Sequence, residues 1–274
     1  MIINTNMIME LSLKMANLNY IPEDTEIYVE GSGIKKVLFG IDIDNAALLY
    51  AKSNGYDLVI GHHPTGSRLG LSEVFKRNVQ MMVENGVQIQ DAEEAVREKA
   101  LAIEIGNHST NYSAIPDFAK LIEMPYMNIH MPCDEIGRKI IQDKINTVCS
   151  ENKGIDLEEL NKVLNDIPEI KNAKTNSEIR IGSPLSKAGR VIFSHGRGTN
   201  GGVEVAKAYY KTGFDTVIYI HISYGDYLKL RKENKGNLII TGHIASDSVG
   251  INPFIQALEK MGVEVDTIGG IIKK

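Results

Sequence analysis

Three short apolar stretches of this sequence each run directly into histidine. They are DLVIG at 57–61 before His62 and His63, TVIYI at 216–220 before His221, and NLIIT at 237–241, which Gly242 separates from His243. Runs of this length, rich in Val and Ile and bounded by polar or turn residues, are typical of buried strands. Ligand sites of open parallel sheets lie beyond the carboxyl ends of the strands. These histidines are therefore in the positions where a parallel sheet places a site.

The two parts of the chain repeat one strand-helix-strand order. Strands at 37–42 and 191–194 are each followed by a helical pattern, at 46–54 and 203–211, and then by a strand that ends in histidine. A constant offset also pairs single residues: Gly55, Tyr56, Asp57, Val59, Ile60 and His63 match Gly213, Phe214, Asp215, Val217, Ile218 and His221. This match favours an ancient duplication. It predicts an α/β fold of two similar halves, with mostly parallel sheets and helices packed outside them.

A polar, weakly patterned stretch separates the two halves. We predict a first half at 1–150, a linker region with a short helix at 151–178, and a second half at 179–274. The first half contains helical patterns across 71–102, with a break at Gly86, and another at 135–148. The second half closes with a helix at 253–261 and a strand at 263–268. The ligand site is expected in the cleft between the halves.

Composition excludes several classes of protein. The chain has 274 residues, of which 43% are hydrophobic, so it can bury a sizeable core. Its net charge of -5 lacks the basic excess of a nucleic-acid binder, and no nucleic-acid partner is expected. Cys133 and Cys149 match neither a disulfide framework nor a paired metal motif. No signal peptide or membrane-spanning run is evident, so we expect a cytoplasmic protein without a membrane partner.

Two histidines are each followed by an aspartate four residues later. They are His130 with Asp134, in HMPCD, and His243 with Asp247, in HIASD. Residues at this spacing share one face of a helix, so each pair can present an imidazole nitrogen and a carboxylate oxygen to one ion. Zn, Mn, Fe and Co favour these donors. The spacing therefore predicts a divalent metal site.

The adjacent histidines at 62 and 63 require a particular backbone. On an extended strand their side chains would point to opposite faces, so both reach one cleft only if the chain turns there. Pro64 favours such a turn. A single histidine after a strand is more often an ordinary hydrogen-bonded residue. We interpret His108, His195 and His221 in that way.

The segments GYDLVIGHHPTG at 55–66 and GHIASD at 242–247 resemble the Nif-three-like family, whose members are often labelled GTP cyclohydrolase I type 2 homologues. In that family a His-His-Pro motif, a His-Thr-Asn-Leu-Asp-like motif and a C-terminal Gly-His-x-x-x-Glu-like motif surround two metal ions. The resemblance implies two divalent ions (Zn, Mn, Fe or Co) and a homo-oligomer, of which the family's form is a ring-shaped hexamer. It implies the metal ligands His62, His63, Asp134, His243 and Asp247.

The chain departs from the family pattern at three places. Asp247 stands where the family usually has Glu, and Met-Pro-Cys fills the second motif. The stretch between the first two motifs is longer, with added helical material around 91–105. A competing alignment places His108 in the second motif, but Tyr112 then stands where an acid is needed, so we favour HMPCD.

Two functions follow from such a site. The first is a metal-dependent hydrolase for a small anionic substrate, nucleotide-like or phosphorylated, in which a metal-activated water attacks a phosphate ester or a purine-like C-N bond. His130 is the candidate for proton transfer, because a histidine suits this role near neutral pH. The alternative is a non-catalytic metal-binding adaptor or metallochaperone. Whether the protein is an enzyme is left open by the sequence.

A glycine-rich loop at Gly196, Arg197, Gly198 and Gly201 follows a strand and precedes a helix. It formally satisfies the dinucleotide fingerprint. A nicotinamide enzyme needs an acid at the end of the next strand, whereas Asp215 opens that strand, so this function is disfavoured. The loop is either a tight turn or a phosphate cradle assisted by Arg197 and the helix N-terminus. Arg68 is either a solvated charge or a second residue that selects an anion.

Overall fold

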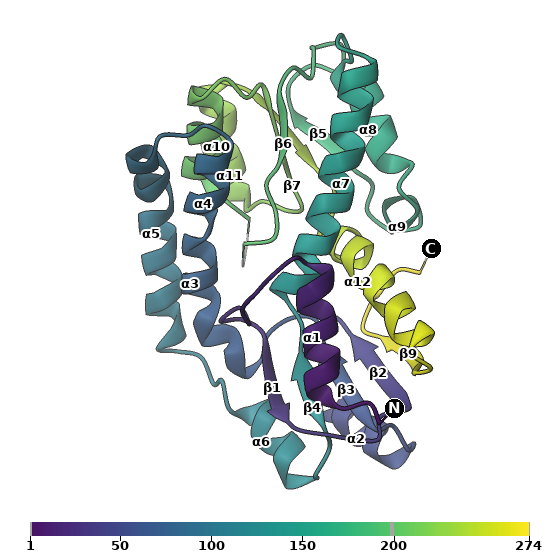
Figure 1. The fold of residues 1–274 in the computed structure, drawn as a ribbon. Coiled ribbons are helices and arrows are strands. Elements are labelled where there is room, and N and C mark those ends of the chain that lie inside the picture. Colours follow the sequence, from purple (N-terminus) through teal and green to yellow (C-terminus); the bar gives the residue numbers. More distant parts are fainter. Residues whose placement is uncertain (1, 198–199, 274) are drawn as a thin grey trace.

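The protein has two sheets, each built mostly of parallel strands (Figure 1). The computed structural model describes residues 2–197 and 200–273. The first sheet has the order β1 (Glu26–Val29), β4 (Tyr126–Asn128), β3 (Leu58–Gly61), β2 (Lys36–Gly40) and β9 (Glu264–Ile268). The second has the order β5 (Glu178–Ile181), β8 (Asn237–Ile240), β7 (Thr216–Tyr219) and β6 (Val191–Phe193). Only β1 and β5 pair antiparallel within these described strands, and both lie at an edge.

Helices cover both faces of each sheet, as the alternating pattern predicts. The first sheet packs against α1 (Thr5–Met15) and α12 (His243–Lys260) on one face, and against α2 (Asn45–Ser53) and α6 (Ala114–Leu121) on the other. The second packs on one face against α3 (Leu71–Lys76), α4 (Asn78–Glu84), α5 (Ile89–Asn107), α10 (Gly202–Lys211) and α11 (Tyr224–Glu233). Its other face packs against α7 (Met131–Glu151), α8 (Leu157–Asn165), α9 (Pro168–Lys171) and part of α12. The expected α/β class is confirmed. In the described residues, no helix combines the length and apolar character needed to cross a bilayer.

The repeated sequence takes up repeated structure. Gly55 ends α2 with φ 71°, and Gly213 ends α10 with φ 88°, a region of backbone conformation that glycine adopts without strain. Asp57 then accepts backbone hydrogen bonds from Lys35 and Lys36, both at 2.9 Å, at the start of β2. Asp215 accepts one from Arg190 at 2.8 Å, just before β6. In both halves the aspartate therefore joins two neighbouring parallel strands at their amino ends.

Three segments differ from the sequence expectations. The last strand, β9, pairs with β2 of the first sheet rather than with the second sheet. The predicted linker contains two helices, α8 and α9. Helix α12 begins at His243, ten residues before the predicted start at 253, and continues through Pro253. The division into domains at 150 and 178 stays a prediction, and β9 shows that sheet membership does not follow it at the C-terminus.

Helices α7 and α12 approach each other through glycine (Figure 1). A Cβ on Gly250 would lie 1.9 Å from the carbonyl oxygen of Cys133, and one on Gly137 would lie 3.0 Å from the backbone nitrogen of Gly250. Gly137 and Gly250 each follow a predicted aspartate ligand by three residues, so they lie within one turn of Asp134 and Asp247. The close crossing therefore brings the two carboxylates together.

This crossing predicts a specific cost for an added methyl group. Gly250→Ala should lower the free energy of unfolding by about 3 kcal/mol, because the backbone of α7 must move to admit the Cβ. Gly106→Ala is the matched control, since a Cβ there meets no atom within 4 Å and alanine favours the helix. Urea denaturation measures both variants. Equal midpoints for the two would show that the helices do not need the glycine contact.

Candidate metal centre

Both sheets point the carboxyl ends of their strands toward one pocket of about 310 Å³. From the first sheet, His62 and His63 follow β3, and His130 follows β4 at the start of α7. From the second, His195 follows β6, His221 follows β7, and His243 begins α12 after β8. The convergence places six histidines and two buried aspartates in one region. Parallel strands explain it, because their carboxyl ends lie at the same edge of a sheet.

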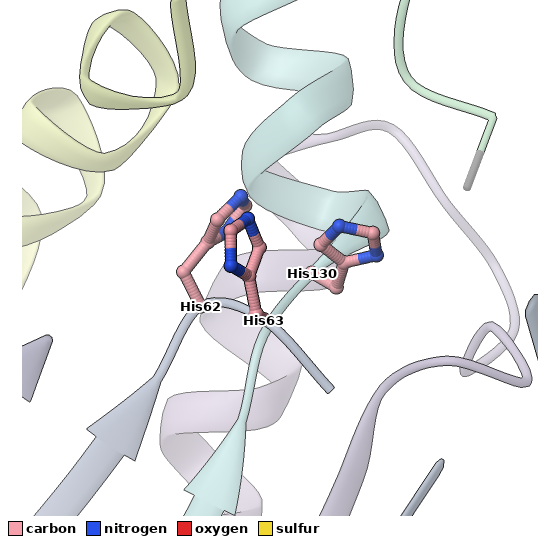
Figure 2. Close-up of side chains that lie close together, drawn as sticks. All are labelled: His62, His63 and His130. Carbon is pink, nitrogen blue, oxygen red and sulfur yellow. The ribbon is translucent and has the colours of Figure 1, made fainter. Parts of the chain in front are cut away.

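The chain turns at His62 and His63, as the adjacent histidines require. The backbone nitrogen of His62 donates to Gly40 at 2.8 Å and that of His63 to Ile41 at 2.9 Å, so the turn stays attached to β2. The ring centroids of His62 and His63 are 5.1 Å apart, and that of His130 lies 5.0 Å from that of His62. Figure 2 shows the three rings gathered where α7 begins.

Two carboxylates stand among the imidazoles. Oδ2 of Asp247 lies 3.6, 3.5 and 3.3 Å from the Nε2 atoms of His62, His63 and His243, respectively. Oδ1 of Asp134 lies 3.3 Å from Nε2 of His62. Donor atoms of His62, Asp134 and Asp247 fall within 4.8 Å of one another, as do those of His63, His243 and Asp247. The five residues implied by the family resemblance therefore lie together in two overlapping groups of candidate metal ligands, and His62, His63 and His130 form a third.

The protein holds three of the imidazoles in one tautomer. Nδ1 of His62 faces the carbonyl oxygen of Ile129 at 3.1 Å, Nδ1 of His63 faces Asp42 at 2.7 Å, and Nδ1 of His130 faces Asp24 at 2.6 Å. A carbonyl or carboxylate oxygen accepts a hydrogen bond, so each Nδ1 carries a proton and donates it. In the neutral ring the lone pair is then on Nε2. Outer partners of this kind prepare a histidine to bind a metal.

The charges in the site are strongly coupled. Burial disfavours an ionised Asp134, but the imidazoles of His195, His130 and His62 outweigh burial and hold the pKa of Asp134 far below its usual range. Burial likewise disfavours a charged His130, yet Asp134 and Asp24 raise the pKa of His130 to about 9. Paired carboxylates and imidazoles thus stabilise each other's charged forms in the absence of a metal.

Several buried atoms in the centre have no hydrogen-bond partner among the described residues. They are Nε2 of His62, His63 and His195, Oδ1 of Asp134, and both carboxylate oxygens of Asp247. Polar atoms buried without partners are rare in proteins and destabilise the fold. Divalent cations bound at these groups would give such atoms partners, and nitrogen with carboxylate oxygen is the donor set that Zn, Mn, Fe and Co favour. The residues fit a metal.

Two histidines interpreted as ordinary hydrogen-bonded residues line the pocket. His221 does form a hydrogen bond, with Asn200, whereas Nε2 of His195 has no partner among the described residues. Nε2 of His195 lies 3.5 Å from Asp134 and 4.0 Å from Asp247. Burial, His243 and Lys99 lower the pKa of His221 to about 4, so its ring is neutral at pH 7. His108 is exposed at the end of α5, as expected.

Sequence reasoning also missed the outer acceptors. Asp42 follows β2 at the same edge as the histidines, and its position after a strand was a usable signal. Asp24 lies in the irregular segment before β1, where no pattern marks it. It reaches His130 only because β1 pairs with β4. Its contribution is therefore visible in the tertiary structure alone.

The glycine-rich loop begins at Gly196, directly after the pocket residue His195. Gly196 has φ 83°, and a Cβ there would lie 2.9 Å from Glu135. The guanidinium of buried Arg197 donates to Glu135 of α7, so its charge is balanced within the protein. Gly198 lies outside the described residues. Phosphate binding by Gly196, Arg197 and Gly198 stays a prediction.

Arg68 is both exposed to solvent and close to the candidate metal centre. Its side chain is exposed, and it lines the same pocket as His63 and His130. The neighbouring Ser67 is buried and hydrogen-bonded to Tyr28 and Asn128, which anchors this short segment to the first sheet. A solvent-exposed positive charge therefore lies at the pocket on a backbone segment anchored to the first sheet.

Comparison with known proteins agrees with this architecture. A NIF3 superfamily protein from Sphaerobacter thermophilus superposes with a TM-score of 0.95 at 40% identity, over 98% of both chains. Reduced HcgD from Methanocaldococcus jannaschii has a TM-score of 0.59 at 12% identity, over 97% of this chain and 98% of that one. A hypothetical protein from Staphylococcus aureus has a TM-score of 0.53 at 12% identity, over 95% and 94%. The last two show the fold alone.

No curated protein matches the sequence. The family model that matches is Duf34/NIF3 (NGG1p interacting factor 3), and it spans residues 27–269. That range includes every histidine of the pocket and both central aspartates. From its sequence and its structure together, the chain belongs to the Duf34/NIF3 family.

Proposed function

We propose that this protein is a metal-dependent hydrolase that binds two divalent ions, Zn, Mn, Fe or Co, and acts on a small nucleotide-like or phosphorylated substrate. The proposed ligands are His62, His63, Asp134, His243 and Asp247. The observation that supports it is the set of buried donor atoms without partners, which converge from both sheets. His195 is a proposed sixth ligand, because its Nε2 is one of these atoms and faces both carboxylates.

The remaining pocket residues suit an anionic substrate. When bound, two close divalent ions lower the pKa of a coordinated water and stabilise negative charge on a substrate oxygen. Arg68 supplies a guanidinium that can bind a phosphoryl or carboxylate group through two parallel hydrogen bonds. A pocket of about 310 Å³ is at the small end of the range for small-molecule sites. A compact anion is therefore the favoured substrate class.

His130 is the proposed proton donor. Asp24 orients its ring through Nδ1, and its Nε2 lies 3.8 Å from Asp134 at the edge of the pocket. In the metal-free protein, Asp134 and Asp24 raise the pKa of His130 to about 9, and a protonated Nε2 in this position can transfer its proton to a departing group.

A second candidate function is a metal carrier or adaptor. The side chain of His243 is 39% exposed although its partner Asp247 is buried, so one ligand of the centre is open to solvent. An open ligand would allow an ion to pass to another protein. We further propose a cytoplasmic homo-oligomer, with the hexamer taken from the family resemblance, and light scattering measures that state.

Two variants should distinguish the loss of metal binding from the loss of catalysis. His62→Ala should lose both the metal and the turnover, because it removes a buried ligand. His130→Gln should keep the metal and lower kcat by about 10²- to 10⁴-fold, the usual contribution of a positioned acid. Elemental analysis and hydrolysis of GTP and phosphate esters with Mn or Zn measure these effects, and His108→Ala is the control. Metal-loaded wild type that hydrolyses none of these compounds would favour the carrier.

Metal removal should destabilise the fold. Binding at a hundred times the dissociation constant adds about 2.7 kcal/mol of stability, so a chelator should lower Tm by roughly 5–10 °C. Asp247→Ala should have the same Tm with and without chelator, because the carboxylate that belongs to two of the ligand groups is gone. Calorimetry on both proteins tests this. If neither chelator nor added zinc changes the Tm of the wild type, the protein does not bind a stabilising metal.

Metal binding should release protons at neutral pH. Burial lowers the pKa of His63, but the neighbouring carboxylates of Asp247 and Asp42 outweigh burial, so the pKa is raised above its usual value in the metal-free protein. Part of the His63 population is then protonated at pH 7 and must lose its proton to bind an ion. Apparent zinc affinity should therefore rise with pH until the ring is neutral. Titration calorimetry in two buffers of different ionisation enthalpy counts the protons, and identical heats at pH 7 would contradict this.

A further inference from the structure

The second half contains a pair of residues that matches Asp42 and His63 of the first. Asp42 and His63 are 21 residues apart, and so are Asn200 and His221. The offset that pairs His63 with His221 thus also pairs Asp42 with Asn200. In each half the first residue precedes a helix, α2 or α10, and its side chain contacts Nδ1 of the histidine after the next strand, at 2.7 Å and 3.1 Å, respectively. The two pairs are equivalent positions of the repeat.

The amide of Asn200 has one chemically acceptable orientation. Its Oδ1 lies 2.9 Å from the ammonium nitrogen of Lys99 and 3.1 Å from the backbone nitrogen of Gly202. Both neighbours can only donate, so the atom between them must be the oxygen. A flipped amide would face two donors with its own donor group, inside a buried environment. Nδ2 of Asn200 therefore donates to Nδ1 of His221.

This contact gives His221 the opposite tautomer from His63. Nδ1 of His63 donates to a carboxylate, which leaves the lone pair on Nε2, whereas Nδ1 of His221 accepts from an amide. The neutral ring of His221 then carries its proton on Nε2. An Nε2 that bears a proton cannot coordinate an ion. His221 also belongs to none of the candidate ligand groups found in the described residues, although it lines the pocket.

The arrangement gives the helical insertion a role. Lys99 lies on α5, the helical material that lengthens the chain between the first two motifs. Besides Oδ1, its ammonium group also bonds the backbone oxygen of Asn200. Without this cation, the Asn200 amide would keep only the Gly202 contact to define its orientation. Through the single side chain of Lys99, helix α5 therefore fixes the tautomer of His221, which follows β7.

We propose that His221 binds the occupant of the pocket rather than the metal: its Nε2-H donates to an anionic oxygen, and Lys99 is the positioning residue that fixes this role through Asn200. The ring of His221 lies against that of His243, with centroids 4.8 Å apart, so the donor stands beside the candidate centre. Arg68 lines the same pocket and adds positive charge. The inference rests on the proposed function in one respect, that this pocket holds the substrate.

The tautomer can be measured without any activity. Long-range proton-nitrogen NMR spectra of protein with ¹⁵N-labelled histidine distinguish a protonated Nε2 from a protonated Nδ1, and the missing signals of His221→Phe assign the residue. We expect a protonated Nε2 in the wild type. Asn200→Asp should reverse the tautomer, because a carboxylate accepts from Nδ1 as Asp42 does in the first half. A protonated Nδ1 on His221 in the wild type would overturn the proposal.

Ligand binding is tested with inorganic phosphate on the zinc-loaded protein. His221→Phe and Lys99→Met should each weaken phosphate binding about tenfold, the effect of losing one hydrogen bond to a charged group. The exposed residues His108 and Lys139 give the matched controls His108→Phe and Lys139→Met, which should bind like wild type. Equal affinity in all five proteins, or no phosphate binding by the wild type, would overturn the donor role.

Zinc content separates this proposal from the proposed function. All five proteins should hold equal zinc, and a loss confined to His221→Phe would make His221 a metal ligand and the proposal wrong. A wild type that takes up no zinc contradicts the proposed function instead. The tautomer in the metal-free protein then still decides whether Asn200 and Lys99 fix His221.

Discussion

Two carboxylates buried side by side are the constraint on which this structure depends. Asp134 and Asp247 offer oxygens within 4.8 Å of one another and of His62 in the interior of the protein. Like charges at this range repel, and burial removes the water that would screen them. The fold tolerates the pair because imidazoles surround it. It brings the pair together because Gly137 and Gly250 let α7 and α12 approach closely.

The two halves of the repeat contact equivalent histidines with different side chains. Each half ends a parallel strand in a histidine and holds the Nδ1 of that ring with a side chain from the loop before a helix. In the proposed roles, Asp42 in the first half leaves a lone pair on Nε2 of His63 for a cation, whereas Asn200 in the second leaves a proton on Nε2 of His221 for an anion. A change from acid to amide at one position thus gives the two halves complementary chemistry. The side chain of Asp42 is 76% exposed. Asn200 is buried, and Lys99 contacts its amide oxygen and fixes the orientation of the amide.

Much of the site was predictable from the sequence because its signals are local. The strand patterns and the four-residue spacing of His130 with Asp134 and of His243 with Asp247 predicted which side chains meet, and the distances of 3.8 and 3.3 Å agree with both. The last helix was expected only from residue 253, whereas α12 begins at His243 and contains Pro253. His195 and His221 were not expected in the pocket, because each stands alone after its strand. Nothing nearby in the sequence distinguishes a pocket histidine from an ordinary one.

The sequence by itself determined the α/β class, the repeat, the family resemblance and the five candidate ligands, because these depend on periodicity and on spacing within single elements. The tertiary structure alone decided which sheet receives β9, which acceptors orient the histidines and which side chain contacts Nδ1 of His221. Those facts depend on pairs such as Asp24 with His130 and Lys99 with Asn200, about a hundred residues apart along the chain. No local pattern records a contact of that kind, because only the packed fold brings its two partners together.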